Sequence, residues 1–478
     1  MPIETSYFNN FAPMINPFSD ETIVALSTPP GTGAIATFRL SGKDTFSICK
    51  NIFRGKKSKS FDISKIKSHT IHHGEIFRDD VLVDEVVLSI FKAPNSYTGE
   101  DIAEISCHGS QFIQQQILQL IIQQGARLAT AGEFTFRAFR NGKFDLSQAE
   151  AVADLIASHS ETSHKFAMQQ MRGGFSGKIK ILRDNLINFA SLLELELDFS
   201  EEDVEFASKA ELKKLISSLQ STIHELIRSF ELGNVIKNGI PVCIVGKPNA
   251  GKSTLLNALL EEERAIVSDI PGTTRDTIED EMVIDGMRFR FIDTAGIRHA
   301  TDTLETAGIE RTYNAIRQSS VVIYLFDAEQ LIIKDLQKEI EAIHKHSGEA
   351  KFFSVANKID ISDETIIRKK FSGFNDIIFI SAKEKKGIEE FKKILAEHFK
   401  NQVGIAPETI VTNSRHAEAL RNAEDALQRV NEGLEKKLSG ELLASDIRIA
   451  LHHLGLITGE ISTNDLLQNI FSRFCIGK

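Results

Sequence analysis

The sequence predicts an α/β plus α protein: an N-terminal α/β domain, then a discontinuous helical domain into which a domain with a mainly parallel β-sheet is inserted. Three observations support this fold class. Short apolar runs surround one helical stretch in the first third of the chain. Apolar residues then recur with helical period in two blocks, from about 145 to 232 and after about 412. Between these blocks, strand-like runs alternate with helices, which is typical of a parallel sheet.

Composition places the chain among ordinary globular proteins. Apolar residues make up 42% and charged residues 26% of the sequence, and no uninterrupted apolar stretch is long enough to span a bilayer. The first basic residue is Arg39, so the start of the chain lacks the positive charge of a secretory signal. We therefore expect a cytoplasmic protein without membrane association. The net charge of −10 is a poor match to a broad basic surface for nucleic acid.

The N-terminal part is predicted to contain an extension and a first domain. Residues 1–20 show no apolar period and are expected to form a loose extension. Residues 21–140 contain strand-like runs such as VVLSIF and DIAEISCHG around the helical FIQQQILQLIIQQG, which ends at Gly125. This pattern indicates a compact α/β domain.

Helical period marks the flanks of the inserted domain. Residues 141–235 and 401–478 are predicted to be the first and second parts of one helical domain. Residues 236–400 lie between them and begin with the strand-like PVCIVG. The four cysteines of the chain show no CxxC spacing, which argues against a disulfide framework or a structural zinc site.

A phosphate-binding motif opens the inserted domain. Residues 246–253 read GKPNAGKS, which fits GxxxxGK[ST], and they follow the apolar PVCIV and precede the helical TLLNALL. The glycines let the backbone wrap around phosphates with its N–H groups pointing inward. Lys252 is expected to neutralise β- and γ-phosphate oxygens, and the Ser253 hydroxyl to hold Mg²⁺.

Three further motifs complete a Ras-like P-loop G domain: DTAG is expected to reach Mg²⁺ through water and to sense the γ-phosphate, and the other two indicate guanine. DTAG (293–296) follows the strand-like MRFRFI, NKID (357–360) follows KFFSVA, and SAK (381–383) follows DIIFI. A carboxylate at Asp360 can accept both the N1 and N2 hydrogens of guanine, whereas adenine offers no such donor pair, so the expected ligand is GTP. The residues expected to contact the nucleotide are Asn249, Ala250, Gly251, Lys252, Ser253, Thr254, Ser268, Asp269, Ile270, Pro271, Gly272, Thr273, Thr274, Asp293, Thr294, Ala295, Gly296, Asn357, Lys358, Asp360, Ser381, Ala382 and Lys383.

The segment between the phosphate loop and DTAG is expected to supply a second Mg²⁺ ligand. It contains SDIPGTTRD, in which Thr274 is the predicted ligand when γ-phosphate is present. The residue after DTAG is Ile297, where Ras-like switches carry the glutamine that orients the attacking water. Residue spacing leaves three downstream carboxylates as candidates for that task, namely Asp302, Glu305 and Glu310.

Longer blocks of sequence carry a more specific signal. They are TIVALSTPPGTGAIATFRLSG, APNSYTGEDIAEISCHG, AGEFTFRAFRNGKFDLSQAEAVADLI and the terminal CIGK, together with GKPNAGKSTLLNAL, DIPGTTRDTIED and IDTAGIR. In these blocks the chain resembles the tRNA-modification GTPase family known as MnmE or TrmE. The resemblance covers nearly everything after the N-terminal extension, and the three N-terminal blocks and the tail are more specific than the shared G motifs.

The resemblance implies a potassium site and a catalytic residue in the G domain. It implies that Asn249 binds K⁺ together with Ser268, Ile270 and Thr273, and that this cation replaces an arginine finger. It also selects Glu305 as the residue that orients or activates the hydrolytic water. The G domains of a homodimer are implied to meet across the nucleotide.

The resemblance further implies that the N-terminal domain dimerises and binds a tetrahydrofolate one-carbon donor. Glu104 would pair with the donor edge of the pterin, while Arg39 and Lys143 would meet acidic or carbonyl groups of the cofactor. Lys478 would approach the same pocket. Cys475 is a candidate for a covalent role, although a free thiol near a chain end is also an ordinary residue.

The function implied by the resemblance is a K⁺-stimulated GTPase of tRNA modification. It would act in a heterotetramer with the flavoprotein MnmG (GidA), which carries FAD, and add a carboxymethylaminomethyl or aminomethyl group at C5 of the wobble uridine of certain tRNAs. GTP hydrolysis would drive opening and closure of the G domains. The alternative is a GTP switch in ribosome assembly, although a basic RNA-binding module is not evident after residue 400. A membrane-docked GTPase is a third possibility, disfavoured by the lack of an apolar or polybasic anchor.

Overall fold

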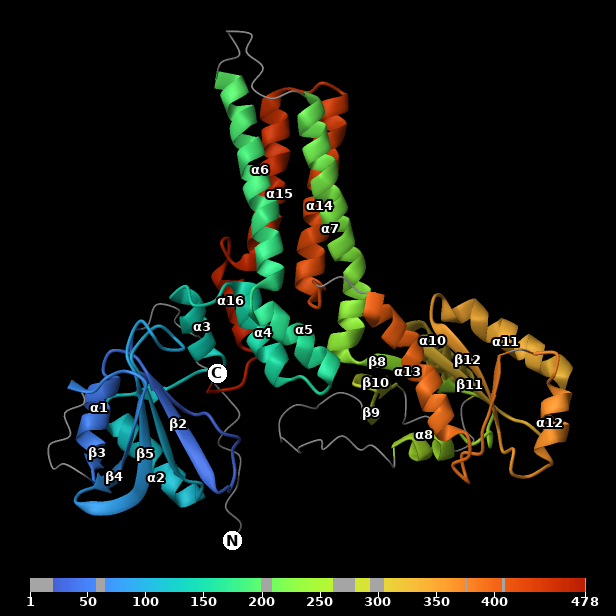
Figure 1. The fold of residues 1–478 in the computed structure, drawn as a ribbon, viewed down its shortest axis with the longest axis horizontal. Helices are drawn as coiled ribbons and strands as arrows, with labels where there is room; N and C mark the ends of the chain where they lie inside the picture. Colours follow the sequence, from blue (N-terminus) through green and yellow to red (C-terminus); the bar gives the residue numbers. More distant parts are fainter. Residues whose placement is uncertain are drawn as a thin grey trace. The chain divides into compact units, whose positions relative to one another are not determined.

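The computed structural model describes residues 20–56, 65–198, 209–260, 280–292, 305–374, 376–405 and 409–477. The chain divides into two compact units, and Figure 1 labels most of their helices and strands. The first unit comprises residues 1–153, 170–202 and 444–478, and the second comprises residues 154–169 and 203–443.

The first unit contains a seven-stranded sheet in the order β3-β4-β5-β6-β2-β1-β7. Neighbouring strands are antiparallel except β1 and β7, which run parallel. The strands are β1 (Ile23–Leu26), β2 (Ile35–Ser41), β3 (Phe53–Gly55), β4 (Thr70–Arg78), β5 (Val81–Phe91), β6 (Ile102–His108) and β7 (Arg127–Leu128).

Alternation along β5 shows why this sheet has one buried face. Val86, Leu88 and Ile90 are buried, while Val87 between them is exposed and Ser89 is half-buried. Such a period of two places every second side chain on the same face. The buried face packs against α1 (Thr45–Ile52) and α2 (Gln111–Gln123) in one hydrophobic core.

Further helices of the first unit place the end of the chain against its N-terminal domain. They are α3 (Glu133–Arg140), α4 (Leu146–Ile156), α6 (Gly174–Asp198), α15 (Gly440–Thr458) and α16 (Asn464–Phe471), of which α4 and α15 extend across the division between units. Helix α5 (Glu161–Met171) lies mostly in the second unit. The ring of Phe471 in α16 lies 5.3 Å from that of Phe136 in α3, centroid to centroid. Beyond α16, Ile476 forms an isolated antiparallel bridge with Ala131.

The second unit contains a six-stranded sheet in the order β13-β12-β11-β8-β10-β9. The pairs are parallel except β9 with β10. The strands are β8 (Ile240–Val245), β9 (Asp280–Ile284), β10 (Met287–Phe291), β11 (Val321–Asp327), β12 (Lys351–Asn357) and β13 (Ile377–Phe379). The predicted α/β plus α class and the mainly parallel sheet are confirmed, while the predicted domain bounds stay predictions.

Helices cover both faces of this parallel sheet. One hydrophobic core joins it to α8 and α13, and a second joins it to α10, α11 and α12. A sheet buried on both faces explains why β8 and β11 are almost continuously apolar. The helices are α8 (Lys252–Leu260), α10 (Glu305–Gln318), α11 (Ile333–Ser347), α12 (Glu364–Lys370) and α13 (Ile388–Ile405).

Two long helices of the second unit pack together although the G motifs separate them in the sequence. They are α7 (Lys209–Asn238), which leads directly into β8, and α14 (Ser414–Glu435). Backbone approaches closely where α7 passes the start of α14, because a Cβ built on Gly233 would lie 2.0 Å from the Val411 carbonyl oxygen. The Val411 N–H also donates a 3.0 Å hydrogen bond to Ser229 Oγ.

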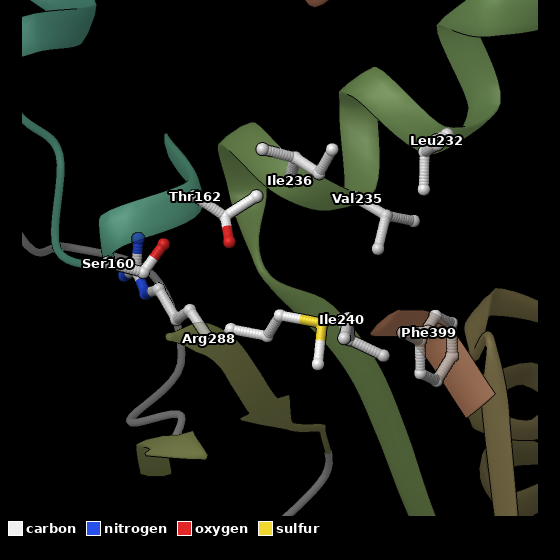
Figure 2. A pocket seen from close by; sticks show the side chains of 9 residues that line it. Ser160, Thr162, Leu232, Val235, Ile236, Ile240, Arg288 and Phe399 are labelled. Carbon is white, nitrogen blue, oxygen red and sulfur yellow. The ribbon is translucent and has the colours of Figure 1, made fainter. Parts of the chain in front are cut away.

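A small, mostly apolar pocket lies where α7 meets the sheet of the second unit, as Figure 2 shows. Ile240, the first residue of β8, contributes to its wall, whereas the phosphate loop follows the last residue of that strand. The pocket is therefore at the opposite end of β8 from the nucleotide motif. Its lining residues are Ser160, Thr162, Leu232, Val235, Ile236, Ile240, Met287, Arg288 and Phe399.

Candidate functional site

The phosphate loop connects β8 to α8 through a backbone path that requires glycine. Gly246 has φ 155°, and a Cβ built on it would lie 2.0 Å from the carbonyl oxygen of Leu325. Gly251 has φ 97°, and its Cβ would lie 2.3 Å from Asn357 Nδ2. Both positions combine positive φ with backbone or side-chain atoms too close for any larger residue. Asn249, between them, is exposed and adopts φ 64°.

Lys252 turns its amino group into this loop. Its Nζ donates to the carbonyl oxygens of Gly246 at 2.8 Å and Lys247 at 2.9 Å. Burial lowers the pKa of this ammonium group, because the charged form loses hydration. A bound phosphate would bring negative charge next to this ammonium group. Ser253 and Thr254 follow in the first turn of α8, half-buried and exposed respectively.

Asn357 joins the phosphate loop to the guanine-specifying loops. This side chain is 2% exposed at the end of β12. Its Nδ2 donates a 2.8 Å hydrogen bond to the Ala250 carbonyl, and its Oδ1 accepts a 2.9 Å bond from the Ala382 N–H. A single buried amide therefore connects three motifs that lie far apart in the sequence.

Asp360 presents its carboxylate at the same edge of the sheet. The residue is exposed, and Ser381 Oγ donates a 2.5 Å hydrogen bond to one of its oxygens. Holding one oxygen in this way fixes the orientation of the carboxylate, which could accept a pair of N–H donors. Lys383, which follows in the SAK loop, has an exposed side chain.

Sequence reasoning missed the partner of Lys358. Lys358 has φ 68°, and its Nζ lies 2.8 Å from Asp327 Oδ2 at the end of β11. Burial opposes ionisation of Asp327, but hydrogen bonds from Lys358 and from the N–H groups of Glu329 and Gln330 outweigh it, so the pKa of Asp327 lies below its ordinary value. A lone acidic residue ending the apolar run VVIYLFD was the available signal.

Several predicted site residues lie outside the part of the chain that the structure describes. The Glu305 backbone begins α10, but its side chain is outside the described set, and Glu310 is exposed on the same helix. No cluster of three metal-binding side chains occurs among the described residues. The predicted residues outside the description are Ser268, Asp269, Ile270, Pro271, Gly272, Thr273, Thr274, Asp293, Thr294, Ala295, Gly296, Asp302 and Lys478.

The first unit brings two predicted cofactor-binding residues together. Arg39 on β2 and Glu104 on β6 are direct cross-strand partners, and Arg39 Nη2 lies 2.7 Å from Glu104 Oε1. Their side chains are 16% and 26% exposed, so the pair is partly accessible. The Arg39 guanidinium also lies 5.5 Å from the ring centroid of Tyr97 and 5.8 Å from that of Phe134.

The C-terminal tail reaches this pair. Arg39 Nη1 donates a 3.4 Å hydrogen bond to the Gly477 carbonyl, and the Gly132 N–H donates to the Cys475 carbonyl at 3.4 Å. Cys475 is exposed, whereas the other three cysteines are buried. Lys143 is placed beside Gly99, where a Cβ would lie 3.3 Å from Lys143 Cε.

A buried charge network near this site was also missed from the sequence. Arg137 is 1% exposed, and its guanidinium pairs with Glu133 at 3.0 Å and Glu100 at 2.9 Å. Arg127 pairs with Glu133 at 2.6 Å. Burial opposes ionisation of Glu133, but its arginine partners and the Thr130 N–H bring its pKa below the ordinary value. These ion pairs hold α3 next to the Arg39–Glu104 pair.

Comparison with known proteins shows the family to which the chain is similar along nearly its whole length. Residues 22–143 match the family described as GTP-binding protein TrmE N-terminus, and residues 146–475 match the MnmE helical domain. A protein of Cytophaga hutchinsonii is 54% identical and one of Flavobacterium johnsoniae 55%, over 96% and 97% of this chain and 98% and 100% of the relatives. A Bacteroides thetaiotaomicron protein is 48% identical over 96% of this chain and 100% of its own. Each is named tRNA modification GTPase MnmE.

Proposed function

Because the chain belongs to the MnmE family, we propose that it uses GTP binding and hydrolysis in forming an aminomethyl-type group at C5 of the wobble uridine of certain tRNAs. The chain is a GTP hydrolase involved in tRNA modification. The observation that carries the nucleotide part is the double hydrogen bond of Asn357, which holds the phosphate loop and the SAK loop at one edge of the sheet.

The cations of the proposed reaction fit the residues that the loop presents. Ser253 in the first turn of α8 would hold Mg²⁺ together with Thr274, and hydroxyl oxygens suit this hard cation. Asn249 would bind K⁺ together with Ser268, Ile270 and Thr273. The exposure of Asn249 supports this proposal, because its side chain is accessible to a cation from solvent. These cations would supply positive charge near the phosphates.

Hydrolysis would then use residues of this chain to position water and phosphate. Lys252 would leave the two loop carbonyls and neutralise phosphate oxygens. Glu305, at the beginning of α10, would orient or activate the water. We propose that two G domains of a homodimer meet across the nucleotide and that their opening and closure time the steps on tRNA.

The one-carbon part of the reaction is proposed for the first unit. Glu104 would receive the donor edge of a tetrahydrofolate derivative, and Arg39, Lys143 and Lys478 its carbonyl or acidic groups. Support comes from the Arg39–Glu104 pair, which is partly exposed and is reached by the tail carrying Cys475. The flavoprotein MnmG with its FAD would be the partner in a cytoplasmic heterotetramer. Among the described residues, no helix has the length and apolar character needed to cross a membrane.

Folate binding tests the proposed role of the Arg39–Glu104 pair. We expect the intact chain to bind 5-formyltetrahydrofolate in isothermal titration calorimetry, and Glu104→Gln to weaken that binding at least about tenfold, since a charged hydrogen bond is worth roughly 1.5–3 kcal/mol. Arg54→Ala is the matched control, because it breaks the exposed ion pair with Asp80 in the same domain. Equal affinities for wild type and Glu104→Gln would remove the carboxylate from the folate site.

A further inference from the structure

We propose that Glu339 of α11 is a positioning residue for the phosphate loop, which it holds through Lys247 while the hydroxyl of Tyr324 fixes its own carboxylate. Lys247 Nζ lies 2.5 Å from Glu339 Oε1, and Tyr324 donates a 2.5 Å hydrogen bond to Glu339 Oε2. The two oxygens of one carboxylate thus connect the core of the sheet to the phosphate loop. The inference rests on the GTPase function.

Tyr324 provides the rigid end of this connection. It is 2% exposed in β11, where its backbone pairs with Val245, the last residue before the phosphate loop. Its ring centroid lies 5.6 Å from that of Phe326 and 6.4 Å from that of Phe352. Burial, together with the acceptor Glu339, raises the pKa of Tyr324, so the hydroxyl stays protonated and donates. A buried hydroxyl of this kind needs an acceptor.

Lys247 connects Glu339 to the phosphate loop, the part of this connection that bears on nucleotide binding. It is the second residue of GKPNAGKS, and its carbonyl is one of the two acceptors of the Lys252 amino group. If Lys252 turns to phosphate oxygens, that carbonyl loses the hydrogen bond from Lys252 and keeps the 3.3 Å bond from the Ala250 N–H. The Lys247 side chain then still ties this end of the loop to Glu339. A loop held in advance loses less conformational entropy on binding, which favours affinity.

A contribution to folding stability does not account for the Lys247–Glu339 ion pair, because both side chains are accessible to solvent. Lys247 is 59% exposed and Glu339 28% exposed in their side chains, and ion pairs this accessible contribute little to folding. Tyr324 would be satisfied by a neutral acceptor at position 339 as well. The feature that needs the charge of Glu339 is the contact with Lys247 in the nucleotide loop.

Release of fluorescent mant-GDP from the full-length protein, followed by stopped flow, tests this inference. We expect Lys247→Met and Glu339→Gln each to release it about fivefold faster, which is roughly 1 kcal/mol. Both should raise the KM for GTP and leave kcat within about twofold. Lys247→Arg should release mant-GDP as slowly as wild type, because arginine keeps the ion pair with Glu339. The double variant Lys247→Met with Glu339→Gln should be no worse than the more affected single variant.

A matched control and the opposing outcomes separate the inference from the function beneath it. Glu435→Gln removes a similarly exposed ion pair, 2.7 Å from Lys213, outside the nucleotide loops and should change nothing. Release rates of Lys247→Met and Glu339→Gln within twofold of wild type, or additive effects in the double variant, would overturn the positioning role. Wild-type protein that fails to bind mant-GDP would instead refute the GTPase function.

Discussion

Replacing Asn357 with alanine is expected to weaken GDP binding strongly while the chain still folds. The variant removes the donor to the Ala250 carbonyl and the acceptor for the Ala382 N–H, at 2.8 and 2.9 Å. Both backbone groups lie in buried surroundings, and Asn357 itself is 2% exposed. In the free variant, water can hydrate these groups only if the phosphate loop and the SAK loop move apart. Nucleotide binding must then bring them together again.

The hydrogen bonds set the size of the effect. A buried polar group left without a partner costs about 1–3 kcal/mol, so two such groups cost roughly 2–6 kcal/mol. At about 1.4 kcal/mol for each factor of ten, the lower bound corresponds to about a thirtyfold loss of affinity. We use the lower bound because the two backbone groups are hydrated in the nucleotide-free variant, where the loops have moved apart.

Equilibrium titration with mant-GDP measures this loss directly. Asn234→Ala is the matched control, because it removes an exposed hydrogen bond from Asn238 in α7 and should bind like wild type. Circular dichroism establishes that both variants are folded. A folded Asn357→Ala protein whose affinity lies within threefold of wild type would refute the idea that this amide holds the two loops together.

Three further predictions concern specificity, cations and pH. Asp360→Asn should lower affinity for GDP and raise it for xanthosine diphosphate, whose altered base edge suits an amide; unchanged preference in competition titrations would exclude Asp360 from base recognition. GTP turnover should slow markedly when K⁺ is replaced by Na⁺, and Asn249→Ala should abolish this difference; equal wild-type rates in both salts would contradict the potassium site. The pKa of Glu133 in the folded protein lies below its ordinary value of 4.5. The ionised carboxylate therefore stabilises the fold at a pH above 4.5, and the free energy of unfolding should fall as the pH falls through the folded-state pKa. Glu133→Gln should flatten this fall in urea unfolding between about pH 5 and pH 3, and an unchanged slope would contradict the role of the carboxylate.

Local pattern predicted the elements that present the nucleotide motifs. The apolar PVCIV became β8, and the helical TLLNALL lies in α8, because alternating strands and helices with motifs at strand ends restrict the fold strongly. The helical FIQQQILQLIIQQG likewise became α2, followed by Gly125 at φ 103°. The same pattern could not give the order of strands in either sheet, since that order depends on contacts between distant segments.

Side-chain pairings were the part that sequence could not predict. Lys247 and Glu339 lie on different elements far apart in the chain, and their common partner Tyr324 reads as an ordinary core residue of a buried strand. Arg137 in α3 is buried, with ion pairs to Glu133 on the same helix and to Glu100, which lies outside it. Spacing along the chain carries no information about such pairings until the fold brings the partners together.

Nucleoside mass spectrometry of tRNA from cells lacking this gene tests the central claim most directly. The cells are complemented with the intact chain or with a chain that ends before Cys475. This truncation also removes Gly477, whose carbonyl accepts a hydrogen bond from Arg39. The account predicts that C5-modified wobble uridines disappear without the gene and return only with the intact chain. An unchanged set of modified uridines in cells without the gene would contradict the role in tRNA modification and leave a GTPase of another pathway, of which ribosome assembly is the first to test.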